Sequence, residues 1–256
     1  MLPHDTWIAA AGLLVGTLYG LFGVGSAFAT PVLSVLGVPG MAAVVGPLPA
    51  LLPGSMAGAW SYSRTDKVDW GVARATLAGA VPATIVGSAM GHHLGGTVLL
   101  VASGIVRGAI GIRVLRPVND DLARQELTAS RRENLVLVVG AAAVVGLLAG
   151  LLANGGGFLL VPMFLLAFGL DMNEATGTSL VVATGLAVPT LITHAVVGDV
   201  DWMVSMSFAV GLIPGVIVGS RIAPRLPTAR LQHAVGVMLV GFSVWFLGRM
   251  ALPALF

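Results

Sequence analysis

Long stretches without a single charged side chain constrain this chain more than any other feature. No Lys, Arg, Asp or Glu occurs in residues 6–63, 75–106, 134–170, 175–198, 202–220 or 231–248. A helix needs about 20 such residues to cross the ~30 Å of bilayer hydrocarbon. Charged residues make up only 9% of the chain, against roughly a quarter in soluble domains. The sequence therefore predicts an all-α, polytopic membrane protein.

The few charges also limit the partners. The sequence pI is about 9.7, but the formal net charge is only +2, and the cations lie in short segments between apolar runs. The positive-inside rule explains that placement, so the bilayer is the expected partner and nucleic acid is not. The chain has no Cys, which excludes thiol chemistry and thiolate metal ligation. The composition implies no cofactor, places the chain in a membrane and leaves a homo-oligomer open.

The sequence contains an internal repeat. Positions 68–88 and 200–220 share ten identities at one fixed offset, including Asp-Trp, Pro and Gly-Ser. Earlier in each half, a Gly-rich stretch followed by Pro occurs at 20–31 and again at 150–162. Chance similarity between apolar helices aligns Val, Ile and Leu, but not these residues in this order. The chain is therefore interpreted as two homologous repeats.

Each repeat is predicted to hold about four apolar segments, the first of them broken at its Gly-rich motif. The expected helices are 7–37 (broken), 41–62, 70–91 and 96–115, then 134–169 (broken), 173–197, 202–223 and 230–248. A first repeat over 1–115, a basic linker over 116–133 and a second repeat over 134–256 are expected. A continuous helix of about 36 residues would be ~54 Å long, too long for one crossing of the bilayer. Non-helical backbone at membrane depth survives only when it is buried in protein or lines a wet cavity.

Either a bent single crossing or a re-entrant pair of shorter helices fits each broken segment. With single crossings, the loop cations divide seven to three, with Arg221, Arg225 and Arg230 on the minority side. With re-entrant segments they divide nine to one, with Arg249 alone. The positive-inside rule favours the second arrangement, in which the two repeats are inverted relative to each other.

The broken segments are the candidate site. A helix that restarts inside the membrane presents free N–H groups and the positive end of its dipole, which attract anions. Secondary transporters bind substrate at such half-helix ends, although glycines also permit plain close packing of helices. The stretches that precede the renewed helices supply the first candidate residues: Gly23, Gly25, Ser26, Asn154, Gly155, Gly156 and Gly157.

These motifs resemble the TauE/SafE family of sulfite exporters and related anion permeases. The resemblance rests on the Gly-rich break followed by Pro, the Gly-Thr-Ser-Leu at 177–180 and the Asp-Trp turn, and it covers nearly the whole chain. It implies gradient-driven transport of sulfite, sulfonates or other small sulfur-containing anions, with Thr178 and Ser179 near the substrate. Repeat one departs from the pattern, because Pro-Leu-Pro at 47–49 stands where repeat two has Thr-Ser-Leu.

Arg107 is the remaining candidate, since it lies halfway along a predicted membrane segment. A charge there is costly unless it is paired or hydrated, so Arg107 is an anion ligand, a latch to a helix-end carbonyl, or an arginine that snorkels to the interface. The alternatives to a carrier are an anion channel and, with less support, an intramembrane enzyme. The residues show no intramembrane pair of carboxylates and no metal-spaced His cluster, so an enzyme is not expected. Substrate identity, transport direction and coupling ion cannot be predicted from the sequence.

Overall fold

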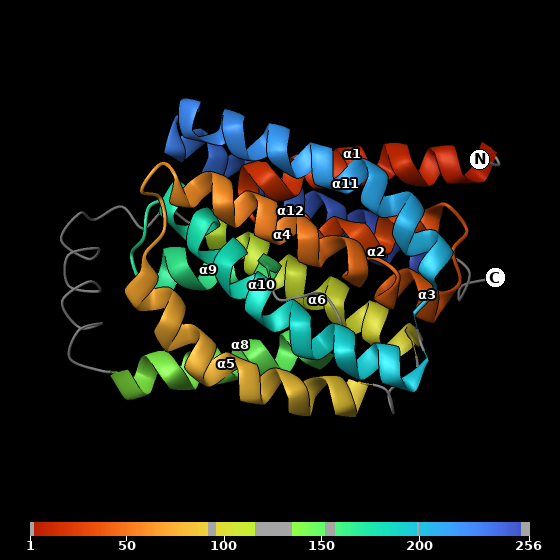
Figure 1. Ribbon diagram of the computed structural model, residues 1–256, viewed down its shortest axis with the longest axis horizontal. Coiled ribbons are helices and arrows are strands. Elements are labelled where there is room, and N and C mark those ends of the chain that lie inside the picture. The colour runs from red at the N-terminus through yellow and green to blue at the C-terminus, as the bar shows by residue number, and fades with distance from the viewer. Residues whose placement is uncertain (1–2, 92–95, 116–134, 152–156, 199, 252–256) are drawn as a thin grey trace.

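The apolar runs form helices in the computed structural model (Figure 1). The structure describes residues 3–91, 96–115, 135–151, 157–198 and 200–251, and all regular secondary structure in these ranges is helical. The long helices are α1 (Pro3–Phe22), α4 (Leu48–Ser63), α5 (Trp70–Gly91), α6 (Gly96–Leu115), α8 (Leu135–Leu151), α10 (Met172–Val197), α11 (Trp202–Ile222) and α12 (Thr228–Ala251). The shorter ones are α2 (Ser26–Val35), α3 (Gly40–Val45), α9 (Gly157–Ala167) and a 3₁₀ turn at Ala223–Arg225. The predicted helical fold is confirmed.

Six of the described stretches are long and apolar enough to cross a membrane. They are Asp5–Phe22, Ala42–Ser63, Trp70–Gly91, Met172–Val196, Trp202–Arg225 and Thr228–Phe246. The outer faces of these helices expose large apolar side chains such as Val196 and Met203. Such surfaces are stable in lipid, where the solvent is as apolar as the side chain. The prediction of a multi-pass membrane protein is therefore confirmed.

Helices α1 and α11 pack along a double stripe of glycines. A Cβ added at Gly16 would overlap the carbonyl oxygen of Leu212, and one added at Gly215 would meet the carbonyl oxygen of Leu13. The stripe repeats every four residues, at Gly12, Gly16 and Gly20 on α1 and at Gly211, Gly215 and Gly219 on α11. Small residues at this spacing let two helix backbones touch, which is the main source of helix association in lipid.

Helices α5 and α8 meet in the same way. A Cβ added at Gly87 would overlap the Leu147 carbonyl oxygen, and one added at Gly146 would overlap that of Ala80. At this contact the Thr84 hydroxyl donates a hydrogen bond to the Gly146 carbonyl at 2.9 Å. Both pairs join a helix from the first half of the chain to one from the second half, so neither half buries its glycine faces alone.

The central helix of the bundle is α10, which packs against α4, α5 and α9. The Asp171 carboxylate caps its first turn by accepting a hydrogen bond from the Glu174 N–H at 2.9 Å. The helix ends at Gly198, whose φ of +86° gives the left-handed C-cap that glycine adopts without strain. On the outside of the bundle, α12 packs against α6.

The glycine contacts also fix the direction of the helices. α1, α4 and α11 run parallel, because successive turns of α1 and of α4 both face successive turns of α11 in the same order. α5, α8 and α10 run parallel to one another for the same reason. α4 and α10 are antiparallel, since Gly58 contacts Leu180 while Gly177 contacts Tyr62. Because α1 and α4 share a direction, the intervening α2 and α3 must carry the chain back, and α9 does the same between α8 and α10.

One predicted helix is divided in two. The segment expected at 41–62 consists of α3 and α4, which separate at Gly46 and Pro47. Proline lacks an N–H group and therefore cannot continue the hydrogen-bond ladder of α3. The division of the chain into repeats over 1–115 and 134–256 stays a prediction.

The glycine stripe makes a direct prediction about stability. We expect Gly16→Ala to lower the thermal unfolding temperature clearly, because its Cβ would overlap the Leu212 carbonyl. Gly140→Ala on α8 is the matched control, because nothing lies within 4 Å of its added Cβ and Ala is favoured over Gly in helices by about 1 kcal/mol. Equal melting temperatures for the two variants would show that the α1–α11 contact does not depend on glycine.

The helix directions predict which loops share a side of the membrane. The chain has no native Cys, so single cysteines can be labelled without background. Lys67→Cys and Arg225→Cys should react with an impermeant maleimide from one side, because each follows the end of a parallel helix. Pro39→Cys, in the turn before α3, should react from the opposite side. Labelling of positions 67 and 225 from different sides would contradict this arrangement.

Candidate functional site

The two Gly-rich breaks touch each other inside the bundle. Gly23 ends α1 with a φ of +69°, a conformation that side chains with a Cβ rarely adopt. A Cβ added at Gly157, the first residue of α9, would lie 2.7 Å from the Gly23 carbonyl oxygen and 3.2 Å from Ser26 Oγ. The break of the first half therefore lies directly against the break of the second.

Two short helices begin at this contact. α2 begins at Ser26 and α9 at Gly157, and the two helices contact each other. In α2 the Ala27 and Phe28 N–H groups donate to the Val24 and Gly25 carbonyls, each at 2.9 Å, and the N-terminus of a helix carries the positive end of its dipole. Both dipoles are thus directed with their positive ends toward one buried region.

Hydroxyl groups surround the contact. Ser26 and Thr176 are fully buried, and within the described part of the chain neither hydroxyl oxygen has a hydrogen-bond partner. Ser179 lies beside them, with its Oγ 2.6 Å from a Cβ added at Gly23, and donates to the Thr176 carbonyl at 2.8 Å. We call Ser26, Thr176 and Ser179 the hydroxyl cluster. An unsatisfied buried hydroxyl costs about 1–3 kcal/mol, so these groups are suited to a polar guest.

The wall behind the hydroxyl cluster comes from α1, α4 and α10. The buried Tyr19 packs against Gly25 and Gly157, and its phenol hydrogen-bonds to Ser55. Thr184 donates to Ser55 Oγ at 3.0 Å, which continues the connection to α10. Tyr62 donates to the Gly20 carbonyl at 2.9 Å. These bonds hold the end of α1, and with it Gly23, in a fixed position.

Most of the described residues predicted from sequence meet here, but not all. Gly23, Gly25, Ser26, Gly157 and Ser179 gather at the contact. Arg107 belongs to α6, and its side chain lies outside what the structure describes. Asn154, Gly155 and Gly156 also lie outside the described residues.

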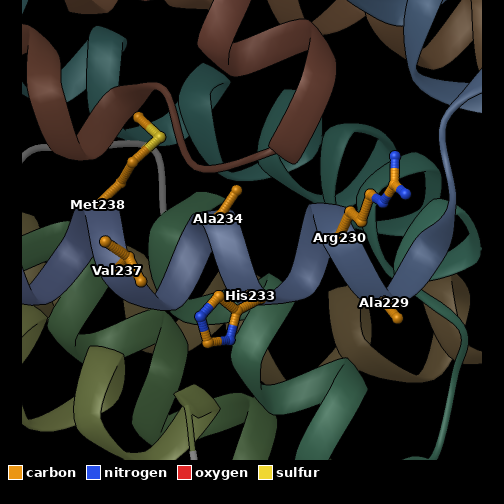
Figure 2. Close-up of a pocket in the computed structure, with 6 residues that line it drawn as sticks. All are labelled: Ala229, Arg230, His233, Ala234, Val237 and Met238. Carbon is orange, nitrogen blue, oxygen red and sulfur yellow. The ribbon is translucent and has the colours of Figure 1, made fainter.

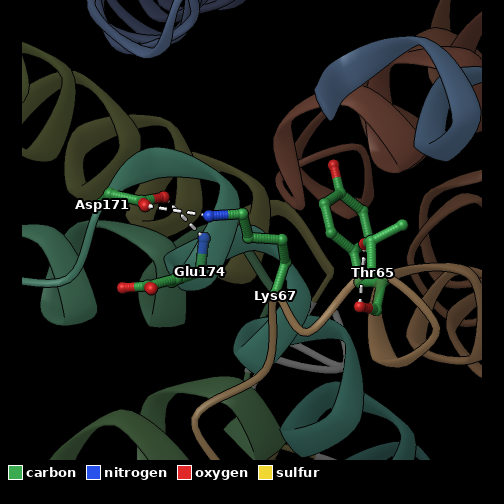
Figure 3. A network of polar contacts seen from close by, with 5 residues as sticks. Thr65, Lys67, Asp171 and Glu174 are labelled. Carbon is green, nitrogen blue, oxygen red and sulfur yellow. Dashed lines mark hydrogen bonds and ion pairs between the residues drawn. The ribbon is translucent and has the colours of Figure 1, made fainter. Parts of the chain in front are cut away.

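Thr178 has a different set of contacts. Its hydroxyl accepts a hydrogen bond from the Asp69 N–H at 2.9 Å. Beside it, Lys67 forms an ion pair with Asp171 at 3.6 Å, and Asp171 caps α10 (Figure 3). Both partners are more than a third exposed, so this pair contributes little to stability. Thr178 and the Lys67–Asp171 pair together attach the turn between α4 and α5 to the start of α10.

Sequence reasoning missed Thr176. It precedes Ser179 by three residues, so the two side chains share one face of α10, whereas Thr178 is rotated about 100° away. The three-residue spacing indicates that Thr176 and Ser179 share a face of α10. The sequence alone does not indicate that this face contacts Gly23. Tyr19 was missed as well, since a tyrosine four residues before a glycine has no distinctive pattern.

A buried break shared by two half-helices, inside a bundle of membrane-spanning helices, is typical of membrane transporters. The family model described as "Sulfite exporter TauE/SafE" matches residues 8–246. The chain therefore belongs to the TauE/SafE family, as its motifs predicted.

Curated relatives agree with this assignment. A probable membrane transporter protein of Xylella fastidiosa (strain 9a5c) is 28% identical, covering 93% of each chain. The probable membrane transporter protein YjnA of Bacillus subtilis (strain 168) is 28% identical, covering 91% of this chain and 96% of the relative. YunE, with the same description and from the same strain, is 23% identical over 94% of each chain. No solved structure matches.

The break at Gly23 can be tested by one methyl group. We expect Gly23→Ala to abolish transport and to lower stability by about 1–2 kcal/mol, because the left-handed conformation strains any residue with a Cβ. Its methyl would also lie 2.6 Å from Ser179 Oγ and 2.8 Å from Val161 Cγ2. Gly37→Ala is the control, since Gly37 has a φ of +87° but open space around its Cβ. A similar loss of transport in both variants would assign the effect to backbone strain alone.

Proposed function

We propose that this protein is a secondary transporter that moves small anions across the cell membrane, driven by a proton gradient or by the membrane potential. Sulfite, sulfonates and related sulfur-containing anions are the first candidates, because the matching family is described as a sulfite exporter family. The relatives are described only as membrane transporters. The proposed substrate class is therefore supported by the family description and by the chemistry of the site.

The observation that carries the anion proposal is the meeting of two helix N-termini at the hydroxyl cluster. Ser26 and Thr176 offer hydroxyl protons that have no acceptor in the described structure. The α2 and α9 dipoles favour negative charge at the same point, and the absence of a Cβ at Gly23 and Gly157 lets the two breaks and Ser179 pack directly against one another. A small oxyanion has several acceptor oxygens in a compact shape, which suits this geometry.

We also propose that the two halves are inverted copies whose relative motion gives alternating access. Residues 1–115 and 134–256 each supply one half-helix to the central contact. The contacts that support this proposal are reciprocal: α1 packs on α11, and α8 packs on α5. The first helix of each half thus packs against a helix of the other half, so residues from both halves surround the proposed site.

Reconstitution in liposomes tests the function. Purified protein should catalyse saturable flux of sulfite, thiosulfate or a small sulfonate under an imposed pH gradient or membrane potential. Flux that rises linearly with concentration would indicate a channel instead. If none of these anions moved under either gradient, the proposed substrate class would be wrong.

A matched pair of variants on α10 tests the site within that assay. Thr176→Val removes a cluster hydroxyl and should raise the half-saturating concentration about ten-fold or more, since a hydrogen bond to a charged group contributes about 1.5–3 kcal/mol. Thr190→Val is the control, because Thr190 is equally buried but donates to the Leu186 carbonyl of its own helix. Unchanged kinetics in Thr176→Val would remove the cluster from the substrate site.

A further inference from the structure

An apolar groove lies on the exposed face of α12, away from the hydroxyl cluster. Its first part is a hollow of about 570 Å³. Figure 2 shows the lining side chains along α12, all from this one helix: Ala229, Arg230, His233, Ala234, Val237 and Met238. Arg230 and His233 are one turn apart and both exposed. The groove therefore combines one basic end with an apolar floor.

The groove continues across α1 and α2. A second hollow shares Val237 and Met238 with the first and adds Phe28 of α2. A third shares Trp245 with the second and ends at Trp7 on α1. Arg230 and Trp245 are about four helical turns apart, roughly 22 Å at 1.5 Å per residue. One bilayer leaflet provides about half of ~30 Å of hydrocarbon, so an acyl chain fits along the groove with space remaining.

The basic end lies where anionic lipid is expected. Arg230 follows the turn between α11 and α12, at the end of the molecule where Arg64 and Lys67 follow the parallel helix α4. Loops rich in Lys and Arg face the cytoplasm, and the cytoplasmic leaflet carries the anionic lipids that attract such residues. Headgroup charge and groove charge are therefore complementary.

We propose that the α12 groove binds one anionic phospholipid. Arg230 holds its phosphate, while His233 extends from the opposite side of α12 (Figure 2), and one acyl chain lies along Ala234, Val237 and Met238. The ligand is a membrane lipid of the phosphatidylglycerol type, and the site is separate from the one that carries substrate.

A second copy of this chain fits the groove less well. Closed dimers are usually two-fold symmetric, so the same patch meets itself. In a membrane the two-fold axis is perpendicular to the bilayer, and Arg230 of each copy would lie at the same depth against the other copy. The described lining of the first hollow contains no acidic side chain, so the same patch on a second copy would supply no partner for Arg230. A phosphate headgroup supplies that partner and neutralises Arg230.

Lipid retention tests the proposal on the full-length protein in detergent. Native mass spectrometry and thermal unfolding would be measured with added phosphatidylglycerol or phosphatidylcholine of identical acyl chains. We expect phosphatidylglycerol to be retained as one molecule per chain and to raise the unfolding temperature more than phosphatidylcholine. Arg230→Gln should reduce this preference about five-fold or more, the factor contributed by one basic group near an anionic headgroup.

Two further variants separate the groove from general surface charge. Arg221→Gln combined with Arg225→Gln removes charge at the same end but outside the groove, and should keep the preference. Val237→Trp fills the half-exposed groove floor without changing charge, and should displace the lipid while the lipid-free unfolding temperature stays the same.

Equal loss in the Arg221–Arg225 variant, or full retention in Val237→Trp, would overturn the proposed site. So would a lipid-free dimer in the mass spectrum that Val237→Trp dissociates, because a second copy would then be the occupant.

Discussion

In hydrocarbon, every backbone N–H and C=O must find a partner within the protein, and the whole architecture follows from that requirement. Two breaks in helices would be intolerable at a lipid-facing position. Here they are placed against each other, where Gly23 and Gly157 are both buried and where the protein supplies the surrounding polar groups. The long helices α1, α4, α5, α8, α10 and α11 can be understood as the shield that keeps lipid away from this contact.

These helices exclude lipid because they approach one another closely. Glycine stripes bring α1 onto α11 and α5 onto α8 with backbone against backbone. Packing of that kind is shape-specific and leaves little room for side-chain rearrangement. Within the described part of the chain, buried hydroxyls without partners occur at Ser26 and Thr176 in the centre and at Thr76 and Ser88 on α5. Close packing of the glycine faces therefore coexists with unmet hydrogen-bonding capacity.

The sequence predicted the helices well and their association poorly. Charge-free runs bounded by Asp-Trp, Gly and Pro signals located the membrane helices, because length and hydropathy decide insertion in lipid. The split at Pro47 was missed because the apolar run continues through it. The direct contact of Gly23 with Gly157 could not be predicted, since it joins residues 134 positions apart in the sequence. Thr178 stays a predicted site residue: it is buried, and its hydroxyl accepts a hydrogen bond from the Asp69 N–H, a contact that its short motif does not predict.

The pairing of α1 with α11 has a consequence for biosynthesis. The glycine face of α1 enters the membrane early, yet the residues that cover it, such as Phe208 and Leu212, are made when most of the chain is complete. At about 5–20 residues per second, that interval is on the order of 10 s or more. During this time the nascent first half sits in the bilayer with its stripe unoccupied, open to other small-residue helices. The α1–α11 contact therefore forms late in synthesis, after nearly all of the other helices are in place.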